Sequence, residues 1–332
     1  AAAVVLFGGY LALYPAIAFA LGGGTVGAGP ARILAYSVRM GAAWTLGEWL
    51  RGWVFTGFPW LSIGYAHIDG PLAGFAPLLG VYGVGTLAAT ISAAIAAAAA
   101  TPPALGRGRA IAIALAIALL PAAAGTALAR LDWATPQGAP IDVRLVQGNV
   151  PQQMKFDRAR ALQAMEDYAA LAEGGDAQLT VLPETAWTTP WSSTPPEIAA
   201  RLLRTARRDG HALAIGMPLF EASGPDPMGL PSPGAALRYT NSVALILPPS
   251  PAIAARYDKQ HLVPFGEFIP TGFAWFVRLM NIPLGEFARG RADQPPFTVA
   301  GQRFAFDVCY EDLFGDEIAR TVRGADGAAG AS

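Results

Sequence analysis

Three residues of types used in covalent catalysis each follow a short, mostly apolar run. Glu184 comes directly after LTVLP, Lys259 ends the run ARYDK, and Cys309 follows RFAFDV. Runs of this kind predict buried strands, and α/β folds place their sites where strand ends meet at a sheet edge. We therefore expect a carboxylate, an ammonium and a thiol to meet at one edge of one sheet.

These residue types are suited to acyl transfer through a thioester. A thiol is mostly protonated near neutral pH, and its thiolate is the nucleophile. A half-buried carboxylate beside it can take the proton as a general base. An ammonium next to both groups favours the thiolate and then stabilises the oxyanion of a tetrahedral intermediate. Cys309 is the only cysteine of the chain, and Lys155 and Lys259 are its only lysines.

Each of the three residues also has an ordinary structural explanation. Glu184 could cap a helix, Lys259 could be a surface charge, and Cys309 could be a small buried apolar residue. A pair of Cys309 with His261 is a second catalytic assignment that the sequence leaves open. The histidines show no metal-ligand spacing, so we expect no metal and no cofactor.

The composition indicates a membrane protein. The 332 residues are 53% hydrophobic and only 14% charged, whereas a soluble domain carries roughly 25% charged residues. The net charge of −1 gives no electrostatic reason to expect nucleic acid as a partner. A single cysteine cannot form an internal disulfide, so the cysteine count does not fix the redox compartment.

Residues 1–130 are predicted to form a helical membrane domain with about four spans. Apolar segments of this length cross a hydrocarbon core of roughly 30 Å. The first begins without a basic region or cleavage signal, unlike a signal peptide, so we expect the chain to begin inside a larger protein. The second is more polar, and its Arg39 and Glu48 are expected to face protein or water. The predicted spans are residues 1–21, 34–50, 72–98 and 110–129.

The arginines predict the orientation of these spans. Arg107 and Arg109 lie in the short connection before the fourth span, and the positive-inside rule places that connection in the cytoplasm. Everything after Arg130 is then expected outside. Arg32, in the first connection, agrees with this orientation, whereas Arg51 disagrees with it.

The connection of residues 51–70 is rich in aromatic side chains. They fit an ordinary aromatic belt at the membrane surface, or an apolar platform that guides a lipid chain toward the outer domain. The sequence leaves both interpretations open. The aromatic residues concerned are Trp53, Phe58, Trp60 and Tyr65.

From about residue 141 to residue 332 short β-type runs alternate with amphipathic helices, which indicates an α/β layer architecture. Residues 224–234 and 273–290 are candidate lids that touch the membrane. Predicted strands are residues 143–147, 179–182, 212–217, 241–247 and 304–308, and predicted helices are residues 158–171 and 196–207.

Several motifs resemble a known family. VLPET around Glu184, YDKQHLVPFGEFIP around Lys259 and FDVCYED around Cys309 resemble the Glu–Lys–Cys signature of the carbon–nitrogen hydrolase (nitrilase) superfamily. More narrowly, LVQGNVPQ, HLVPFGEFIP, CYE and the membrane stretch EWLRGWVFTGFPW resemble the bacterial apolipoprotein N-acyltransferases. The similarity covers most of the chain, from the second predicted span to Cys309.

The resemblance implies a polytopic helical membrane domain that carries an α/β domain of the nitrilase-like αββα sandwich type. Glu184 matches the general base of the family, and Lys259 matches the lysine that stabilises the oxyanion. The backbone N–H of Tyr310 is the implied second donor. Three further positions match supporting or substrate-binding residues, and at the last of them the family often has tryptophan. These positions are Glu267, Glu311 and Phe156.

The resemblance also implies a two-step reaction at the outer face of the bacterial inner membrane. Cys309 attacks an acyl ester of a phospholipid, typically phosphatidylethanolamine, to give a thioester and a lysophospholipid. The N-terminal amine of a diacylglyceryl-cysteine apolipoprotein then takes the acyl chain. The catalytic domain is expected to face the periplasm, without a cofactor, in a monomer.

The chain departs from the family pattern at both ends. The family has more than four membrane helices, and its fold continues well beyond Cys309, so we expect a fragment whose domain of residues 141–332 is truncated. Two alternative functions are a membrane-tethered amidase that hydrolyses a C–N bond and a non-enzymatic lipid-binding membrane protein. Acyl transfer is favoured because an enzyme that uses a membrane lipid needs membrane spans. Without them the donor would have to be extracted from the bilayer at a cost of about 0.8 kcal/mol per CH₂. An amidase for small amides has no such need.

Overall fold

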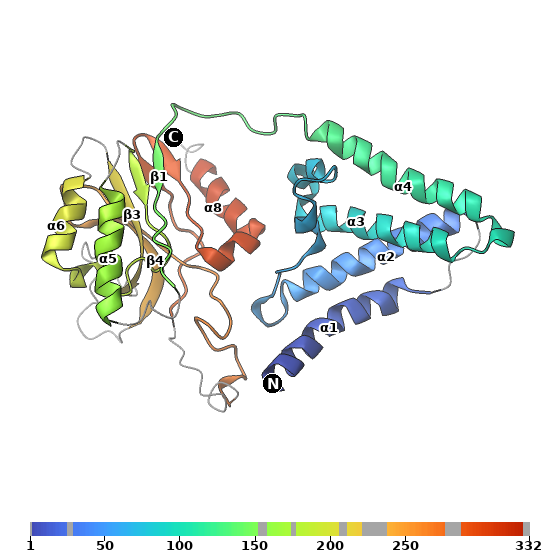
Figure 1. The fold of residues 1–332 in the computed structure, drawn as a ribbon, viewed down its shortest axis with the longest axis horizontal. Helices are drawn as coiled ribbons and strands as arrows, with labels where there is room; N and C mark the ends of the chain where they lie inside the picture. Colours follow the sequence, from blue (N-terminus) through green and yellow to red (C-terminus); the bar gives the residue numbers. More distant parts are fainter. Residues whose placement is uncertain are drawn as a thin grey trace. The chain divides into compact units, whose positions relative to one another are not determined.

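The computed structural model describes residues 2–24, 29–151, 158–173, 177–205, 211–220, 238–275 and 287–327 (Figure 1). The chain divides into two compact units, Ala1–Pro136 and Gln137–Ser332. The candidate lid of residues 224–234 and most of the candidate lid of residues 273–290 lie outside the described residues.

Long helices build the first unit. Among the described residues, three helical segments are long and apolar enough to cross a membrane: Val4–Gly22, Ala73–Ala100 and Arg107–Leu128. The second predicted span is also helical, and the helix that contains it, Pro30–Arg51, is less apolar because it carries Arg32, Arg39, Glu48 and Arg51. The long helices are α1 (Ala2–Gly22), α2 (Pro30–Arg51), α3 (Ala76–Ala100) and α4 (Arg107–Leu128), and short 3₁₀ helices are η1 (Val54–Thr56), η2 (Ile63–His67), η3 (Ala73–Phe75) and η4 (Pro103–Leu105).

Small and hydroxyl residues let α2 approach α3 closely. A Cβ atom at Gly41 would overlap the hydroxyl of Thr90, and the hydroxyls of Thr45 and Thr86 lie 2.7 Å apart. Such residues are typical of helix contacts in membranes. The charge of Arg39 is also accommodated, because its guanidinium donates to the carbonyls that end α1, at 3.1 Å and 3.2 Å.

The connection after α2 is held by the two charged residues at the end of that helix. Glu48 is buried and accepts a hydrogen bond from the Ile63 N–H at 2.9 Å. Arg51 donates to the carbonyl of Trp60 at 2.7 Å. The apolar side chains that this connection leaves exposed include Trp53, Phe55, Leu61 and Ile68.

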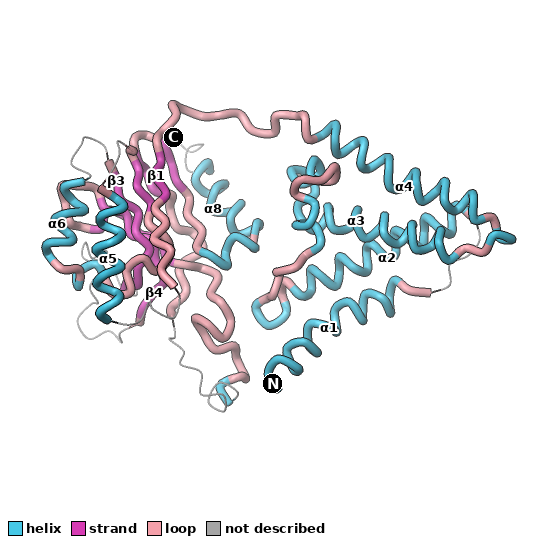
Figure 2. The backbone as a smooth tube through the Cα atoms, viewed as in Figure 1, coloured by secondary structure: helices cyan, strands magenta, loops and turns pink. Residues whose placement is uncertain are grey.

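A five-stranded mixed sheet forms the centre of the second unit (Figure 2). The strand order is β1-β2-β3-β4-β5, with β1, β2 and β3 parallel and β3, β4 and β5 antiparallel. The strands are β1 (Val143–Leu145), β2 (Leu179–Val181), β3 (Ala212–Phe220), β4 (Tyr239–Ile246) and β5 (Ile253–Asp258).

Both faces of this sheet are covered. The helices α5 (Arg158–Ala172) and α6 (Pro196–Thr205) pack on one face, where Leu213, Ile215 and Met217 of β3 enter the core. On the other face, Ala214 and Val243 pack against a two-stranded sheet of β6 (Phe297–Val299) and β7 (Gln302–Phe304). Figure 1 shows α8 (Gly315–Gly327) on the side opposite α5 and α6. The layers therefore follow the αββα arrangement, which confirms the predicted fold class.

Four of the five predicted strands are present, and the prediction of the fifth, residues 304–308, is wrong. Residues 305–308 belong to no strand, and β7 ends at Phe304. The apolar pattern that predicted a strand has another cause, because Phe306 and Val308 pack into the core between the sheets without joining a ladder. Cys309 therefore follows an extended loop and opens a 3₁₀ helix, η7 (Cys309–Leu313).

Candidate active site

Glu184 lies on a turn that rests directly on β3. The turn follows β2 and is fixed by hydrogen bonds from the Leu182 N–H to Ala214 and from the Trp187 N–H to Gly216. A Cβ atom at Gly216 would overlap the Pro183 carbonyl and lie 2.7 Å from the Cα of Glu184. Glycine at this position of β3 is therefore what lets the Glu184 turn approach the sheet.

Lys259 is buried at the end of β5. Its side chain is 1% exposed, and its N–H donates to the Asn241 carbonyl at 2.8 Å. Its Nζ donates to Glu184 Oε1 at 3.3 Å and to Glu267 Oε1 at 3.1 Å. Burial alone would lower the pKa of the Lys259 ammonium, but the two carboxylates outweigh burial and raise that pKa. The lysine is therefore held as a cation between two acids.

Asn241 joins the same two carboxylates. Its Nδ2 donates to Glu184 Oε1 and to Glu267 Oε1, each at 2.7 Å. Glu267 Oε2 in turn accepts from the Val263 N–H at 2.8 Å. Sequence reasoning did not assign Asn241 to the site, although an asparagine inside the strand run TNSVALI is a signal, because a buried amide needs partners.

Cys309 sits on a strained turn beside these groups. Its φ is +55°, a left-handed conformation uncommon outside glycine. The residue is exposed, and its thiol lies close enough to the Glu184 carboxylate for that group to shift the thiol pKa. Partial desolvation, followed by the Glu184 carboxylate, raises the pKa of the Cys309 thiol, whereas the Lys259 ammonium lowers that pKa. The structure thus brings Glu184, Lys259, Glu267 and Cys309 together.

Glu311 links the turn that carries Cys309 to the segment that carries Lys259. The carboxylate is buried, and its Oε1 accepts from the backbone N–H groups of Gln260 at 2.6 Å and His261 at 3.1 Å. Its Oε2 accepts from the Val308 N–H at 2.7 Å, directly before Cys309. Burial raises the pKa of the Glu311 carboxyl, and these hydrogen bonds oppose that shift.

Tyr310 and His261 pack together next to this link. Tyr310 is buried, and its ring lies edge-on to the His261 imidazole, with ring centroids 5.4 Å apart. His261 also stacks on Phe314, and its Nδ1 lies 3.1 Å from Glu317 Oε1. The interactions described for the Cys309 thiol are instead with Glu184, Lys259 and Glu267. We therefore propose Glu184, rather than His261, as the base.

Phe156 lies outside the described residues. Within the described part of the chain, no three His, Cys, Asp or Glu side chains are grouped so that they could hold a metal ion.

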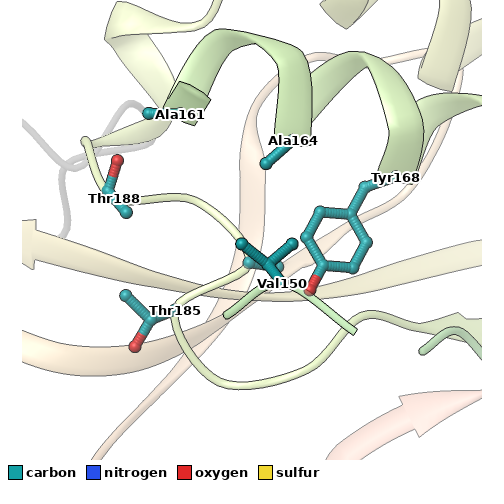
Figure 3. A pocket seen from close by; sticks show the side chains of 7 residues that line it. Val150, Ala161, Ala164, Tyr168, Thr185 and Thr188 are labelled. Carbon is teal, nitrogen blue, oxygen red and sulfur yellow. The ribbon is translucent and has the colours of Figure 1, made fainter. Parts of the chain in front are cut away.

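A small pocket lies beside the Glu184 turn (Figure 3). Its volume is about 10 Å³, which leaves room for about one water molecule. The pocket is therefore too small for an acyl chain. Its lining residues are Val150, Ala161, Ala164, Tyr168, Thr185, Ala186 and Thr188.

Comparison with known proteins agrees with the predicted resemblance. Residues 142–328 match the carbon-nitrogen hydrolase family, and residues 1–94 match the apolipoprotein N-acyltransferase N-terminal domain. Proteins named apolipoprotein N-acyltransferase are similar over nearly the whole chain. The one from Ralstonia nicotianae is 46% identical over 330 residues, covering 98% of this chain and 58% of the relative.

Two further relatives of that name show the same pattern. The protein from Bordetella bronchiseptica is 41% identical, covering 100% of this chain and 63% of the relative. The protein from Chromobacterium violaceum is 40% identical, covering 95% of this chain and 57% of the relative. The chain thus spans about three fifths of the length of these relatives. With more than half of its residues matched, the chain belongs to the carbon–nitrogen hydrolase family.

Proposed function

We propose that this chain carries the catalytic centre of an apolipoprotein N-acyltransferase. The reaction moves an acyl chain from a phospholipid to the N-terminal amine of a diacylglyceryl-cysteine apolipoprotein, through a thioester on Cys309. The observation that carries the proposal is the buried ammonium of Lys259, bound by Glu184 and Glu267 beside the thiol of Cys309. The helices that are apolar enough to span a membrane support a lipid donor over a small soluble amide.

In the first step Glu184 takes the thiol proton while the Cys309 sulfur attacks the ester carbonyl of the phospholipid. Lys259 stabilises the oxyanion that develops, because its cation is already fixed in place. The ester C–O bond then breaks, and Glu184 returns the proton to the departing lysophospholipid. The implied second oxyanion donor is the backbone N–H of Tyr310.

In the second step the free amine of the apolipoprotein attacks the thioester. Glu184 accepts a proton from the amine, the C–S bond breaks, and Cys309 leaves and recovers a proton. Glu267 and Asn241 keep the Lys259 cation and the Glu184 carboxylate oriented through both steps. We propose phosphatidylethanolamine as the donor, and the periplasmic side of the inner membrane as the location of the site.

The test is an intact-mass measurement on the full-length protein that contains this chain. After incubation with phosphatidylethanolamine vesicles and no acceptor, we expect a mass gain of one acyl chain that Cys309→Ala abolishes. Adding a diacylglyceryl-cysteine peptide should then remove the adduct and yield an N-acylated peptide. Failure to form the adduct in a folded protein would contradict the proposal. Rapid resolution of the adduct by water, with C–N bond hydrolysis, would instead indicate a membrane-tethered amidase.

A further inference from the structure

The described segment of residues 287–294 runs along the backbone of the segments that carry two site residues. The Phe287 N–H donates to the carbonyl of Glu267 at 2.9 Å. The Gly290 N–H donates to the carbonyl of Lys259 at 2.8 Å. Both acceptors are main-chain groups, so the segment acts on where the backbone lies rather than on the reactive side chains.

Gln294 binds both main-chain groups of the residue that precedes Lys259. Its Oε1 accepts from the Asp258 N–H at 2.7 Å, and its Nε2 donates to the Asp258 carbonyl at 2.6 Å. Asp258 ends β5, which is an edge strand of the five-stranded sheet, and edge strands present unpaired backbone groups. The glutamine amide therefore takes the place of a neighbouring strand at this one residue.

The segment lies very close to Asp258, and Gln294 is also bound to the backbone of its own segment. A Cβ atom at Gly290 would overlap the Asp258 carbonyl and lie 2.8 Å from the Asp258 Cβ, so only glycine allows this approach. The Nε2 of Gln294 also donates to the Arg291 carbonyl at 2.8 Å, which fixes the amide relative to its own segment.

The side chain of Asp258 is fixed by side chains of β4 and β5. Its Oδ1 accepts from the Ser242 hydroxyl and from the Arg256 guanidinium, each at 2.6 Å. Successive residues of a strand point to opposite faces, so this network holds Asp258 while leaving Lys259 to face the site. Among the described residues, Gln294 is the hydrogen-bond partner of both the N–H and the carbonyl of Asp258.

We propose that Gln294 is a positioning residue for Lys259. A lysine side chain has four rotatable bonds, so its Nζ reaches both carboxylates only if its backbone is fixed. Gln294 fixes the peptide before Lys259, and Gly290 fixes the peptide after it. This inference deepens the proposed function, since it concerns the residue to which we assign oxyanion stabilisation.

The experiment replaces Gln294 with leucine in the full-length protein, which keeps the side-chain size and removes every amide hydrogen bond. The first readout is the pH profile of iodoacetamide alkylation at Cys309, followed by intact mass. We expect the midpoint to move to higher pH, because the Lys259 ammonium retreats from the thiolate. The second readout is phospholipid-dependent acyl transfer, which should fall by about tenfold or more. Gln163→Leu, on the exposed face of α5, is the matched control and should leave both readouts unchanged.

Gln294→Glu keeps the acceptor for the Asp258 N–H and loses the donor to its carbonyl, so its midpoint should lie between those of the wild type and Gln294→Leu. If Gln294→Leu does not fold, this variant decides the question. A wild-type alkylation profile in a folded variant overturns the proposal. The profile needs no acyl donor. If the variant profile is shifted while the wild-type protein transfers no acyl chain, the proposed function is refuted and the positioning role still stands.

Discussion

Asn241, like Lys259, binds both carboxylates of the site. We predict that Asn241→Leu lowers the rate of acyl transfer by about 10- to 160-fold, because hydrogen bonds to charged groups are worth about 1.5–3 kcal/mol. Leucine keeps the size of the side chain, so we expect the substitution to affect the rate of transfer more strongly than the thermal stability. The measurement is phospholipid-dependent transfer to a diacylglyceryl peptide. A wild-type rate in this variant would show that Lys259 alone orients Glu184.

The pH at which the Cys309 thiol loses its proton depends on its charged neighbours. The pKa of its thiol is raised by partial desolvation and by Glu184, and is lowered by Lys259. Alkylation should therefore rise at a pH above the roughly 8.5 of an ordinary cysteine. Glu184→Gln should move the midpoint down, and Lys259→Met should move it further up.

The readout for this prediction is specific because the chain has one cysteine. The urea-unfolded protein serves as the control, since its thiol should titrate as a free cysteine. Opposite shifts in the two variants are the expected signature. A shift of the same sign in both would mean that the variants act through local unfolding rather than through charge.

The apolar runs that precede them were sufficient to name Glu184, Lys259 and Cys309, and the family resemblance added Glu267 and Glu311. The sequence was not sufficient for Asn241 and Gln294. Asn241 reaches the site because β4 lies beside β5 in the register that pairs Ser242 with Asp258. Such pairing between distant segments leaves no mark in local spacing, so contacts of this type appear only in the fold.

The Glu184 turn and β3 pack so closely at Gly216 that they behave as one element. We predict that Gly216→Ala lowers acyl transfer by more than tenfold, because the added methyl group would overlap the Pro183 backbone and displace the Glu184 turn. Overpacking of this kind also destabilises a core by about 1–3 kcal/mol. The measurements are the transfer rate and the free energy of unfolding in urea.

Gly315→Ala is the matched control, since a Cβ at Gly315 meets no atom within 4 Å. It should leave the transfer rate unchanged. If Gly216→Ala lost stability but kept its rate, the base would not depend on the contact between its turn and β3.

The predicted strands are correct where the apolar run belongs to a hydrogen-bonded strand, and wrong where the apolar residues only pack into the core. The runs around β2, β3 and β4 are buried because both faces of the sheet are covered. Residues 305–308 show a similar pattern, yet Phe306 and Val308 only pack between the sheets. The turn that follows could not be foreseen either, because the left-handed backbone of Cys309 is disfavoured for its residue type.

At the scale of the whole molecule, the proposed function requires a membrane unit because the proposed acyl donor is a lipid. Residues 1–94 match the N-terminal domain of the acyltransferases, and residues 142–328 match the hydrolase family. Composition alone predicted a membrane domain, since charged residues are rare before residue 130. The polarity of α2 is explained only by contacts, as Arg39 caps α1 and Glu48 holds the connection that follows.

The exposed side chains of the connection of residues 51–70 form either an apolar platform for a lipid or an aromatic belt. Leu61 is 81% exposed and has a φ of +65°, and its neighbours Trp60 and Ser62 are bound by Arg51. We predict that Leu61→Asn lowers transfer from phospholipid vesicles by about tenfold, because burying a leucine against lipid is worth about 1.5–3 kcal/mol. Asparagine tolerates the left-handed conformation, so the backbone should not change.

The control for this prediction is Leu105→Asn, which removes an exposed leucine from η4. Alkylation of Cys309 by water-soluble iodoacetamide should be unaffected in both variants, because neither alters the site itself. A platform predicts a loss of transfer in Leu61→Asn alone. Equal rates in the two variants would instead assign the exposed residues of this connection to anchoring at the membrane surface, where one leucine among several aromatic side chains matters little.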